Sequence, residues 1–399
     1  MYSDGERAAL QGATKEALTW LSEPERQAEM ERDLRALVDL SSHTPNREGV
    51  TAVARALSTL LTERCASLTV DLVASERFGE HLVARTPAQG SRTLLIGHHD
   101  TVFPLASFAG FREDGDLLRG PGVLDMKGGL VVMSYALAAL ERAGVLAKLP
   151  LAFVSVSDEE VGSPEGGDLL RALCKDARAA LVFESGRQQD RIITRRKGTG
   201  AVNVIAAGKA AHAGNLHHEG VNAIWALSRF VDHAQRCTDY DRGITVNVGR
   251  VEGGIGKNTV PDHAKAELDI RYVTLGDGEA LVRALEAACR AAEAEVPGAQ
   301  LTLTGGMGRK PLERTEASGA LLGVYATAAS AEGLGTEESP LLGGGSDANT
   351  VAELGVPAID GLGPRGKGFH TVDEQIERRT LTPKTRALVR ALVALAIAS

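Results

Sequence analysis

The sequence predicts an α/β protein in which a mostly parallel sheet carries helices on both faces and a smaller α+β domain is inserted. Short apolar runs alternate with stretches of helical periodicity between residues 93 and 183, and this alternation is typical of a parallel sheet covered by helices. Between about residues 192 and 303, strands with alternating apolar and polar residues take over. The α/β pattern then resumes, which predicts that the outer domain is discontinuous.

The first part of the outer domain is predicted at residues 1–193. It begins with amphipathic helices between residues 6 and 40, where Leu34, Leu37 and Leu40 follow helical spacing. The remaining elements are predicted as helices over 51–64, 125–143 and 167–174 and as strands over 68–73, 81–85, 93–96, 151–156 and 179–183.

The inserted domain is predicted at residues 194–306 and the second part of the outer domain at 307–399. Within the insertion, a β-α-β-β-α-β order suggests a ferredoxin-like sandwich, and roughly 110 residues suffice for an independent domain. Its strands are expected over 201–206, 245–251 and 264–272, with helices over 223–236 and 277–295. The second outer part is expected to hold helices over 318–331, 347–354 and 383–396 and a strand over 357–360.

Composition narrows the class of protein. The formal net charge is −8, with 44 basic and 52 acidic residues, and no run of like charges indicates binding to nucleic acid or a membrane surface. No 18 consecutive residues are apolar and no signal peptide is visible at the N-terminus. The four cysteines are far apart, which is typical of reduced thiols. We therefore expect a cytoplasmic enzyme without a nucleic-acid or membrane partner.

Acidic and histidine side chains follow the predicted strands where those strands end. His98 and Asp100 come after the strand at 93–96 and share one face, because side chains alternate along a strand. Glu159 and Glu160 follow the next strand, and Glu184 follows the third. Sites in open α/β sheets form beyond the carboxyl ends of strands, so these groups are expected to converge.

Their chemistry predicts a metal site. Histidine and carboxylate ligands without thiolates suit zinc, with manganese or cobalt as alternatives. A pair of hydrolytic metal ions sharing a bridging carboxylate needs about five protein ligands. His98, Asp125, Glu160, Glu184 and the later His370 supply that set.

Each motif also has an ordinary interpretation. A single His-x-Asp pair usually makes a structural hydrogen bond, and adjacent glutamates are usually solvated; only their conjunction favours a metal site. A phosphate-binding loop is imitated at 361–368 but lacks its Ser/Thr and following helix. A serine-hydrolase turn at 344–348 fails because Ala348 stands where glycine is needed.

Taken together, the motifs resemble those of the dinuclear zinc carboxypeptidase/aminoacylase family, which includes bacterial glutamate carboxypeptidases, acetylornithine deacetylase and succinyl-diaminopimelate desuccinylase. The glycine triplet before Ser346 makes the glutamate carboxypeptidase branch the nearest. The matching segments are 97–104, 120–129, 158–163, 211–214, 257–261, 269–272, 343–347 and His370, in the family's order.

The resemblance implies a role for each residue of the site. Asp125 would bridge two zinc ions, with His98 and Glu184 on one and Glu160 and His370 on the other. Asp100 would orient His98, and Glu159 would be the general base. The resemblance also implies a cis peptide between Asp125 and Met126.

The inserted domain would be a lid and dimerisation surface, and the protein a homodimer. His212 would reach the partner subunit's active site and stabilise the oxyanion; without the resemblance it reads as a surface histidine. Asn258 and Arg271 would bind the substrate carboxylate. Arg309 is a further candidate, although an interdomain salt bridge is as good an explanation. Gly344 and Gly345 would offer backbone N–H groups to an anionic ligand.

The expected function is metal-dependent hydrolysis of the amide bond of a C-terminal, glutamate-type amino acid or of an N-acylated amino acid. The substrate would be a small peptide or an N-acyl amino acid. Within the hydrolases, the alternative is an N-acyl-amino-acid deacylase or desuccinylase. Outside them, it is a binding protein on the same fold that has lost its metals, which a metal assay would distinguish.

Overall fold

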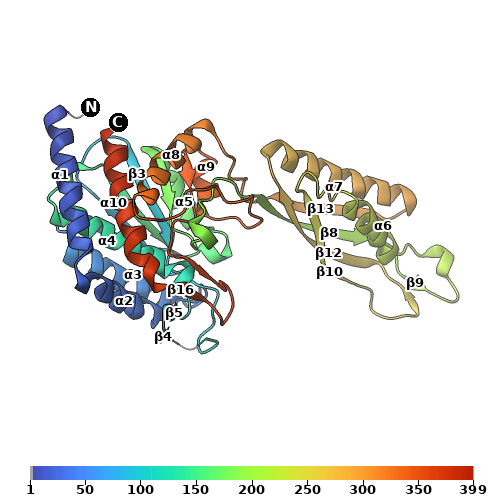
Figure 1. Ribbon diagram of the computed structural model, residues 1–399. Coiled ribbons are helices and arrows are strands. Elements are labelled where there is room, and N and C mark those ends of the chain that lie inside the picture. Colours follow the sequence, from blue (N-terminus) through green and yellow to red (C-terminus); the bar gives the residue numbers. More distant parts are fainter. Residues whose placement is uncertain (1–2, 109, 399) are drawn as a thin grey trace. The chain divides into compact units, whose positions relative to one another are not determined.

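The computed structural model describes residues 3–108 and 110–398 and divides the chain into two compact units (Figure 1). The first unit comprises residues up to 194, residues 314–340 and residues from 346 onward. The second unit comprises residues 195–313 and 341–345. The insertion was predicted at 194–306, so the second unit extends further than expected. The segment that follows the unit's last strand pairs with the segment that precedes its first strand, because Arg196 and Leu312 exchange backbone hydrogen bonds.

The first unit contains a six-stranded sheet whose centre is parallel. Strands β6, β3, β7 and β14 run parallel, and β1 and β2 add an antiparallel edge. The strands lie in the order β1 (Thr69–Val73), β2 (His81–Arg85), β6 (Leu151–Val156), β3 (Arg92–His98), β7 (Ala177–Val182) and β14 (Ala358–Ile359).

Helices cover both faces of this sheet, as its composition requires, since β3 and β6 are buried almost throughout. On one face, Leu95 and Phe153 join a single core with the larger helices. On the other face, where Leu94 and Val154 are buried, α5 (Gly166–Cys174) and α9 (Asp347–Ala352) pack together against β7. The larger helices are α1 (Asp4–Leu21), α2 (Pro24–Val38), α3 (Arg47–Arg64), α4 (Gly128–Arg142), α8 (Glu316–Ser330) and α10 (Leu381–Ile397).

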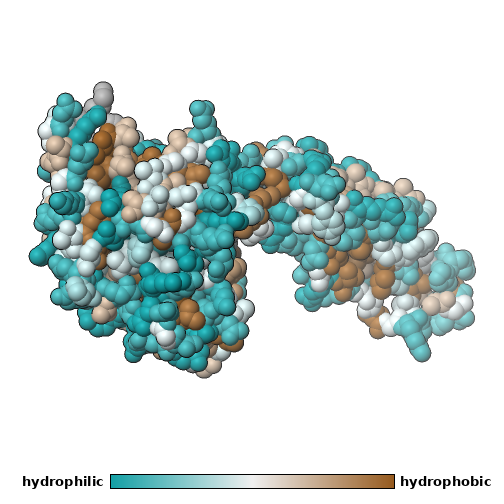
Figure 2. All heavy atoms as spheres, viewed as in Figure 1, coloured by the Kyte–Doolittle hydropathy of each residue, from teal (hydrophilic) through white to brown (hydrophobic). Residues whose placement is uncertain are grey.

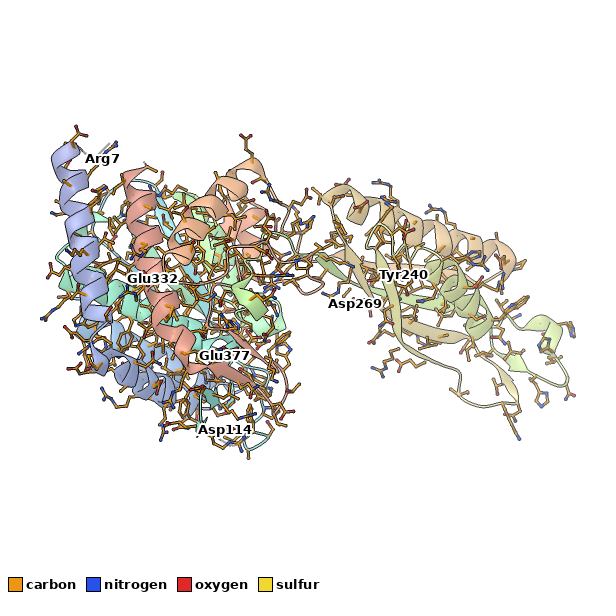
Figure 3. All side chains as sticks on the ribbon, in the orientation of Figure 1. Arg7, Asp114, Tyr240, Asp269, Glu332 and Glu377 are labelled. Atoms are coloured by element: carbon orange, nitrogen blue, oxygen red, sulfur yellow. The ribbon has the colours of Figure 1, made fainter. Side chains whose placement is uncertain are left out.

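The termini of the first unit lie in neighbouring helices. In Figure 1, α1 (blue) runs beside α10 (red), and the two are in contact. Glu332, which follows α8, accepts hydrogen bonds from Arg386 and Arg390 of α10 at 2.5 Å each (Figure 3). These ion pairs connect the last helix to the segment that follows α8.

Helix α4 begins three residues later than predicted. Residues 123–127 form one wide turn in which Asp125 and Met126 have non-helical backbone angles. The peptide between these two residues is cis, as predicted. The stretch Val123–Arg142 is long and apolar enough to cross a membrane, but its most apolar window of 18 residues, with mean hydropathy 1.5, is buried inside the unit. A buried helix on a parallel sheet explains this composition.

A second, small sheet in the first unit was not predicted. Its strands are only two or three residues long, so they carry no periodic pattern that sequence reasoning could detect. Their order is β15 (Gly366–Lys367), β16 (Gln375–Glu377), β5 (Leu117–Arg119) and β4 (Arg112–Asp114).

The second unit is a ferredoxin-like sandwich, as predicted. Its antiparallel strands lie in the order β13-β8-β12-β10, which is 4-1-3-2 in chain order. Alternate residues of β8, such as Val202 and Val204, form a core with Phe230 and Leu285 of the two helices. The elements are β8 (Gly198–Ala207), α6 (Ala223–Gln235), β10 (Thr245–Gly253), β12 (His263–Tyr272), α7 (Leu275–Glu295) and β13 (Gln300–Met307).

Candidate metal centre

Five predicted metal ligands come together at the carboxyl edge of the parallel sheet. His98 is the last residue of β3, Glu160 lies in the turn after β6, and Glu184 comes two residues after β7. Asp125 is held beside them by the turn before α4. His370 belongs to the connection between β15 and β16. The topology therefore assembles side chains that are up to 272 residues apart in the sequence.

The two oxygen atoms of Asp125 face different histidines. Its Oδ1 lies 3.3 Å from Nε2 of His98, and its Oδ2 lies 3.4 Å from Nε2 of His370. His98 Nε2 is also 3.8 Å from Glu184 Oε1, and His370 Nε2 is 3.1 Å from Glu160 Oε2. Asp125 thus stands between one histidine–glutamate pair and another.

These separations fit the packing of ligands around metal ions. Nitrogen and oxygen ligands bind zinc at about 2.0–2.1 Å in a tetrahedron, which places neighbouring ligand atoms about 3.4 Å apart. In addition, Glu160 Oε1 is buried and accepts no hydrogen bond from the part of the chain that the structure describes. An unsatisfied buried carboxylate oxygen and a thiol-free donor set suit a divalent cation.

The pKa values of the site residues also favour a bound cation. Burial raises the pKa of Glu160 to about 7, and burial together with the charge of Asp125 raises the pKa of Glu184 well above its usual range. Hydrogen bonds to Asp125 and Glu160 raise the pKa of His370 to about 10. The site therefore concentrates negative charge that protons or cations must neutralise.

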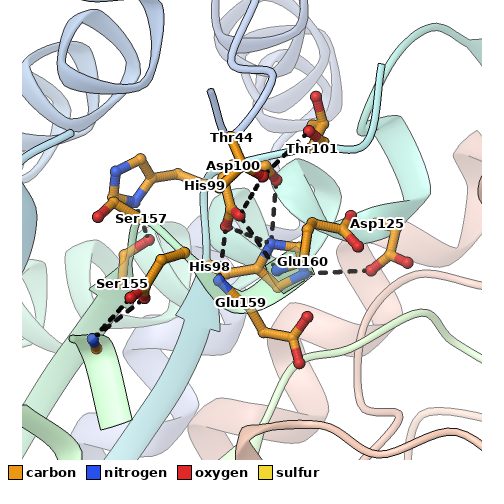
Figure 4. Close-up of polar contacts among 12 residues, drawn as sticks. Thr44, His98, His99, Asp100, Thr101, Asp125, Ser155, Ser157, Glu159 and Glu160 are labelled. Atoms are coloured by element: carbon orange, nitrogen blue, oxygen red, sulfur yellow. Dashed lines mark hydrogen bonds and ion pairs between the residues drawn. The ribbon is translucent and has the colours of Figure 1, made fainter. Parts of the chain in front are cut away.

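Asp100 organises one side of this centre (Figure 4). Its Oδ1 lies 3.3 Å from Nδ1 of His98, and that nitrogen is also 3.1 Å from the Asp100 carbonyl oxygen. The Nδ1 proton is therefore shared with Asp100, which leaves Nε2 of His98 as the ligand atom. The backbone N–H groups of Glu159 and Glu160 donate to the Asp100 carboxylate at 3.2 Å each, and Thr44 Oγ1 donates at 2.8 Å.

Glu159 lies in the same turn but projects a separate carboxylate. One of its oxygens, His98 and a Glu184 oxygen form a group whose ligand atoms all lie within 4.8 Å of one another. Glu159 therefore reaches the centre beside the two pairs described above. Its position suits a base that acts on a ligand of the site.

Two buried charged residues beside the centre were missed by sequence reasoning. Glu374 accepts the backbone N–H groups of Leu124 and Asp125 at 2.8 and 3.0 Å. Lys127 donates to the Leu40 carbonyl at 2.9 Å, and burial lowers its pKa to about 7. In the sequence, each of these two residues looks like an ordinary solvated charge, because only the tertiary fold buries it.

His99 has the separate place that strand alternation predicts. Its ring nitrogens lie 2.8 Å from Ser155 Oγ and 3.0 Å from the Glu80 carbonyl oxygen. Burial lowers its pKa to about 3, so it is a neutral structural histidine of the sheet.

The remaining predicted site residues belong to the second unit. His212 ends the short strand β9 (Ala211–His212), which pairs with β11 (Thr259–Val260) next to Asn258. Nδ1 of His212 accepts backbone N–H groups from Gly214 and Asn215 at 3.1 and 3.0 Å. This arrangement places the His212 proton on Nε2, where it can be donated to a ligand.

Arg271 and the glycine triplet also meet within the second unit. Arg271 binds Asp269 through Nε and an Nη, both at 2.8 Å, and its other Nη donates to the Gly343 carbonyl at 3.3 Å. Figure 3 marks Asp269 on β12. Arg196 donates to the Gly344 carbonyl at 3.0 Å, so Gly344 and Gly345 belong to a loop held through carbonyl groups. Arg309 accepts the Tyr272 hydroxyl through its own carbonyl at 3.0 Å.

Comparison with known proteins agrees with this geometry. The profile of peptidase family M20/M25/M40 matches residues 94–394. The chain is 30% identical to carboxypeptidase G2 of Pseudomonas sp. (strain RS-16), over 85% of this chain and 82% of that protein. It is also 30% identical to a protein of Mycobacterium tuberculosis named for succinyl-diaminopimelate desuccinylase, over 79% and 86% of the two chains.

The fold is shared with solved structures. One is a Bacillus subtilis protein described as a dinuclear metal-binding peptidase of the M20 family, with a TM-score of 0.71 and 14% identity, covering 95% of this chain and 100% of that one. At 14% identity this structure shows only that the fold is shared, whereas the sequence matches show the family. The chain belongs to peptidase family M20/M25/M40, and it is a metallopeptidase or amidohydrolase of the carboxypeptidase or deacylase type.

Proposed function

We propose that this protein is a two-zinc carboxypeptidase that releases a C-terminal, glutamate-type amino acid by hydrolysing its amide bond. The observation that carries the proposal is the Asp125 carboxylate, whose two oxygens face His98 and His370 separately. A bridging ligand needs this arrangement. The likeness to carboxypeptidase G2 over most of both chains supports the substrate class.

His98 and Glu184 would hold one ion, and Glu160 and His370 the other, with cobalt or manganese as possible replacements for zinc. Two bound ions would supply Lewis acidity, polarising the scissile carbonyl and making the attacking water more acidic. Asp100 keeps His98 in the tautomer that presents Nε2. The protein's part here is to fix ligand number and orientation.

Glu159 is the proposed general base. It takes a proton from the attacking water and returns it to the leaving amine, which needs a carboxylate within reach of the centre. Its oxygen lies within the group formed with His98 and Glu184. The backbone N–H groups of Glu159 and Glu160 donate to Asp100, which holds the turn from which the Glu159 carboxylate projects.

Asn258 and Arg271 are the proposed binders of the substrate's free carboxylate. Arg271 uses three of its N–H groups on Asp269 and the Gly343 carbonyl. Because a guanidinium has five N–H groups in a planar fork, two others, one on each terminal nitrogen, are available for an incoming carboxylate. Bidentate recognition of this kind favours arginine over lysine.

His212 is the proposed donor to the oxyanion, acting across a homodimer formed by the second units. Its tautomer supports the role, because the Nε2 proton is available. Exposed apolar side chains support the interface: Ile224 and Trp225 on α6 are 42% and 54% exposed, and Val251 on β10 is 55% exposed. Figure 2 shows apolar side chains gathered over the strands of this unit, and β10 is an edge strand.

A second candidate is an N-acyl-amino-acid deacylase or desuccinylase. The match to the Mycobacterium tuberculosis protein favours it, because the identity is again 30% over most of both chains. The two reactions share the chemistry of the metal centre and differ in the group on the nitrogen side of the amide bond.

A substrate panel separates the candidates. Zinc-loaded protein is assayed with peptides ending in glutamate or alanine and with acetyl, succinyl and benzoyl amino acids, and Glu159→Gln protein serves as the control for contaminating hydrolases. The proposal expects the highest kcat/KM for release of C-terminal glutamate. Preference for succinyl or acetyl amino acids would favour the second candidate, and no hydrolysis of any amide would contradict both.

A further inference from the structure

Glu374 is a fully buried carboxylate for which the proposed mechanism has no use. Its side chain is 0% exposed. Oε1 accepts two successive backbone N–H groups, from Leu124 at 2.8 Å and from Asp125 at 3.0 Å. It therefore binds the main chain of the proposed bridging residue directly.

Glu374 also belongs to the turn that carries His370. The Thr371 N–H donates to the Gly368 carbonyl, and the Glu374 N–H donates to the Thr371 carbonyl at 3.1 Å. His370 itself has a left-handed φ of +62°, a conformation that non-glycine residues adopt only where the surroundings hold them. One side chain thus joins the segments that supply two of the five ligands.

The surroundings of Glu374 disfavour the ionised form of its side chain. Burial and the charge of Asp125 raise its pKa to about 8, although the N–H groups that it accepts act in the opposite direction. The ammonium group of Lys127, which is also buried, lies close enough for the Glu374 charge to affect its pKa. The burial of this carboxyl group is therefore unfavourable in itself, and its contribution comes from the hydrogen bonds that it accepts from the main chain.

We propose that Glu374 is a positioning residue for the metal centre. It fixes the backbone of Leu124 and Asp125 against the His370 turn, so that the two oxygens of Asp125 meet His98 on one side and His370 on the other. This inference rests on the proposed metal-dependent function, and it concerns the reach of an acceptor oxygen rather than the charge of the side chain.

Three substitutions distinguish the effect of the position of the Glu374 acceptor oxygen from the effect of the side chain's charge. Glu374→Gln keeps an acceptor oxygen at the same distance and removes the charge. Glu374→Asp keeps the charge but withdraws the oxygen by one methylene, and Glu374→Ala removes both. Glu332→Ala is the matched structural control, because Glu332 is a largely buried glutamate whose contacts with α10 are remote from the centre.

Zinc affinity is measured by competition with a chromophoric chelator, the cobalt-loaded proteins are compared by visible absorption, and the unfolding of each metal-free protein is followed. We expect Glu374→Ala and Glu374→Asp to lose 10–100-fold in affinity for at least one ion, as substitutions behind metal ligands do, and to change the cobalt spectrum. Glu374→Gln should remain within about threefold of wild type. Glu332→Ala should lower stability alone.

The inference is overturned if Glu374→Asp keeps wild-type affinity while Glu374→Gln loses it, since charge would then be the decisive property. It is also overturned if every Glu374 variant binds zinc as wild type does. If the Ala variant does not fold, the Asp and Gln variants still decide. A wild-type protein that binds no metal would instead contradict the proposed function, so the two failures are distinguishable.

Discussion

At the residue scale, Asp100 shows how one carboxylate serves several parts of the centre. Its orientation of His98 was expected from the family resemblance, and side-chain alternation already predicted that the two residues point to the same side. Its hydrogen bonds to the Glu159 and Glu160 backbone could not, because they depend on β3 and β6 being neighbours. The same limit explains Glu374 and Lys127, whose burial arises only when distant segments pack.

Replacement of the proposed base is the sharpest test at this scale. Glu159→Gln should bind metal as wild type does but lose about 10²–10⁴-fold in kcat, which is the usual contribution of general acid–base catalysis. The amide is isosteric and cannot accept the proton. Steady-state kinetics and elemental analysis of the same sample provide both quantities.

Glu160→Gln is the matched control, since the two residues are adjacent. It should weaken metal binding as well as turnover, because Glu160 Oε2 faces His370 at 3.1 Å. Near-normal turnover in Glu159→Gln, or reduced metal content in that variant alone, would exclude the proposed division of roles.

At the scale of elements, predictions succeeded where burial left a continuous apolar pattern. The strand expected over 151–156 is β6. The helix expected from residue 125 begins instead at Gly128, because residues 123–127 form a wide turn that keeps Asp125 outside the helix. The small sheet whose β15–β16 connection contains His370 could not be predicted, since its strands are too short to show a periodic hydrophobic pattern.

Helix α10 offers a stability test of the core beneath the sheet. Leu388 is fully buried there, so Leu388→Ala should lower the free energy of unfolding of the first unit by about 2–5 kcal/mol through lost burial and a cavity. Leu354→Ala is the control, because Leu354 is 45% exposed and its truncation should change stability by less than about 0.5 kcal/mol. Urea unfolding followed by circular dichroism measures both, and equal effects would contradict the packing described.

At the scale of the whole molecule, the inserted unit was predictable because the hydrophobic period changes from the α/β pattern to two-residue alternation. Its end was misplaced because residues 307–313 return to pair with residues 196–199, a contact without a local signal. The Asp269–Arg271 pair was not anticipated either, although strand alternation places both residues on one face of β12.

Mixing two inactive variants tests whether His212 acts across a dimer. Glu159→Gln and His212→Ala proteins are combined under conditions of verified subunit exchange. If His212 serves the partner's site, a heterodimer contains one site with both groups intact, and activity should return to a fraction of the wild-type value. Exchange without any recovery, or an active monomer, would show that His212 acts within its own chain or has no catalytic role.

Metal content per chain tests the central claim most directly, because the proposed roles of the five ligands and of Glu159 depend on two ions at the Asp125 centre. Elemental analysis of purified protein should find close to two divalent ions per chain, and activity lost on chelation should return when zinc, cobalt or manganese is added. Asp125→Asn should lose both ions together, since this residue faces both histidine–glutamate pairs. A protein that holds no divalent metal and gains no activity from any of the three would contradict the account.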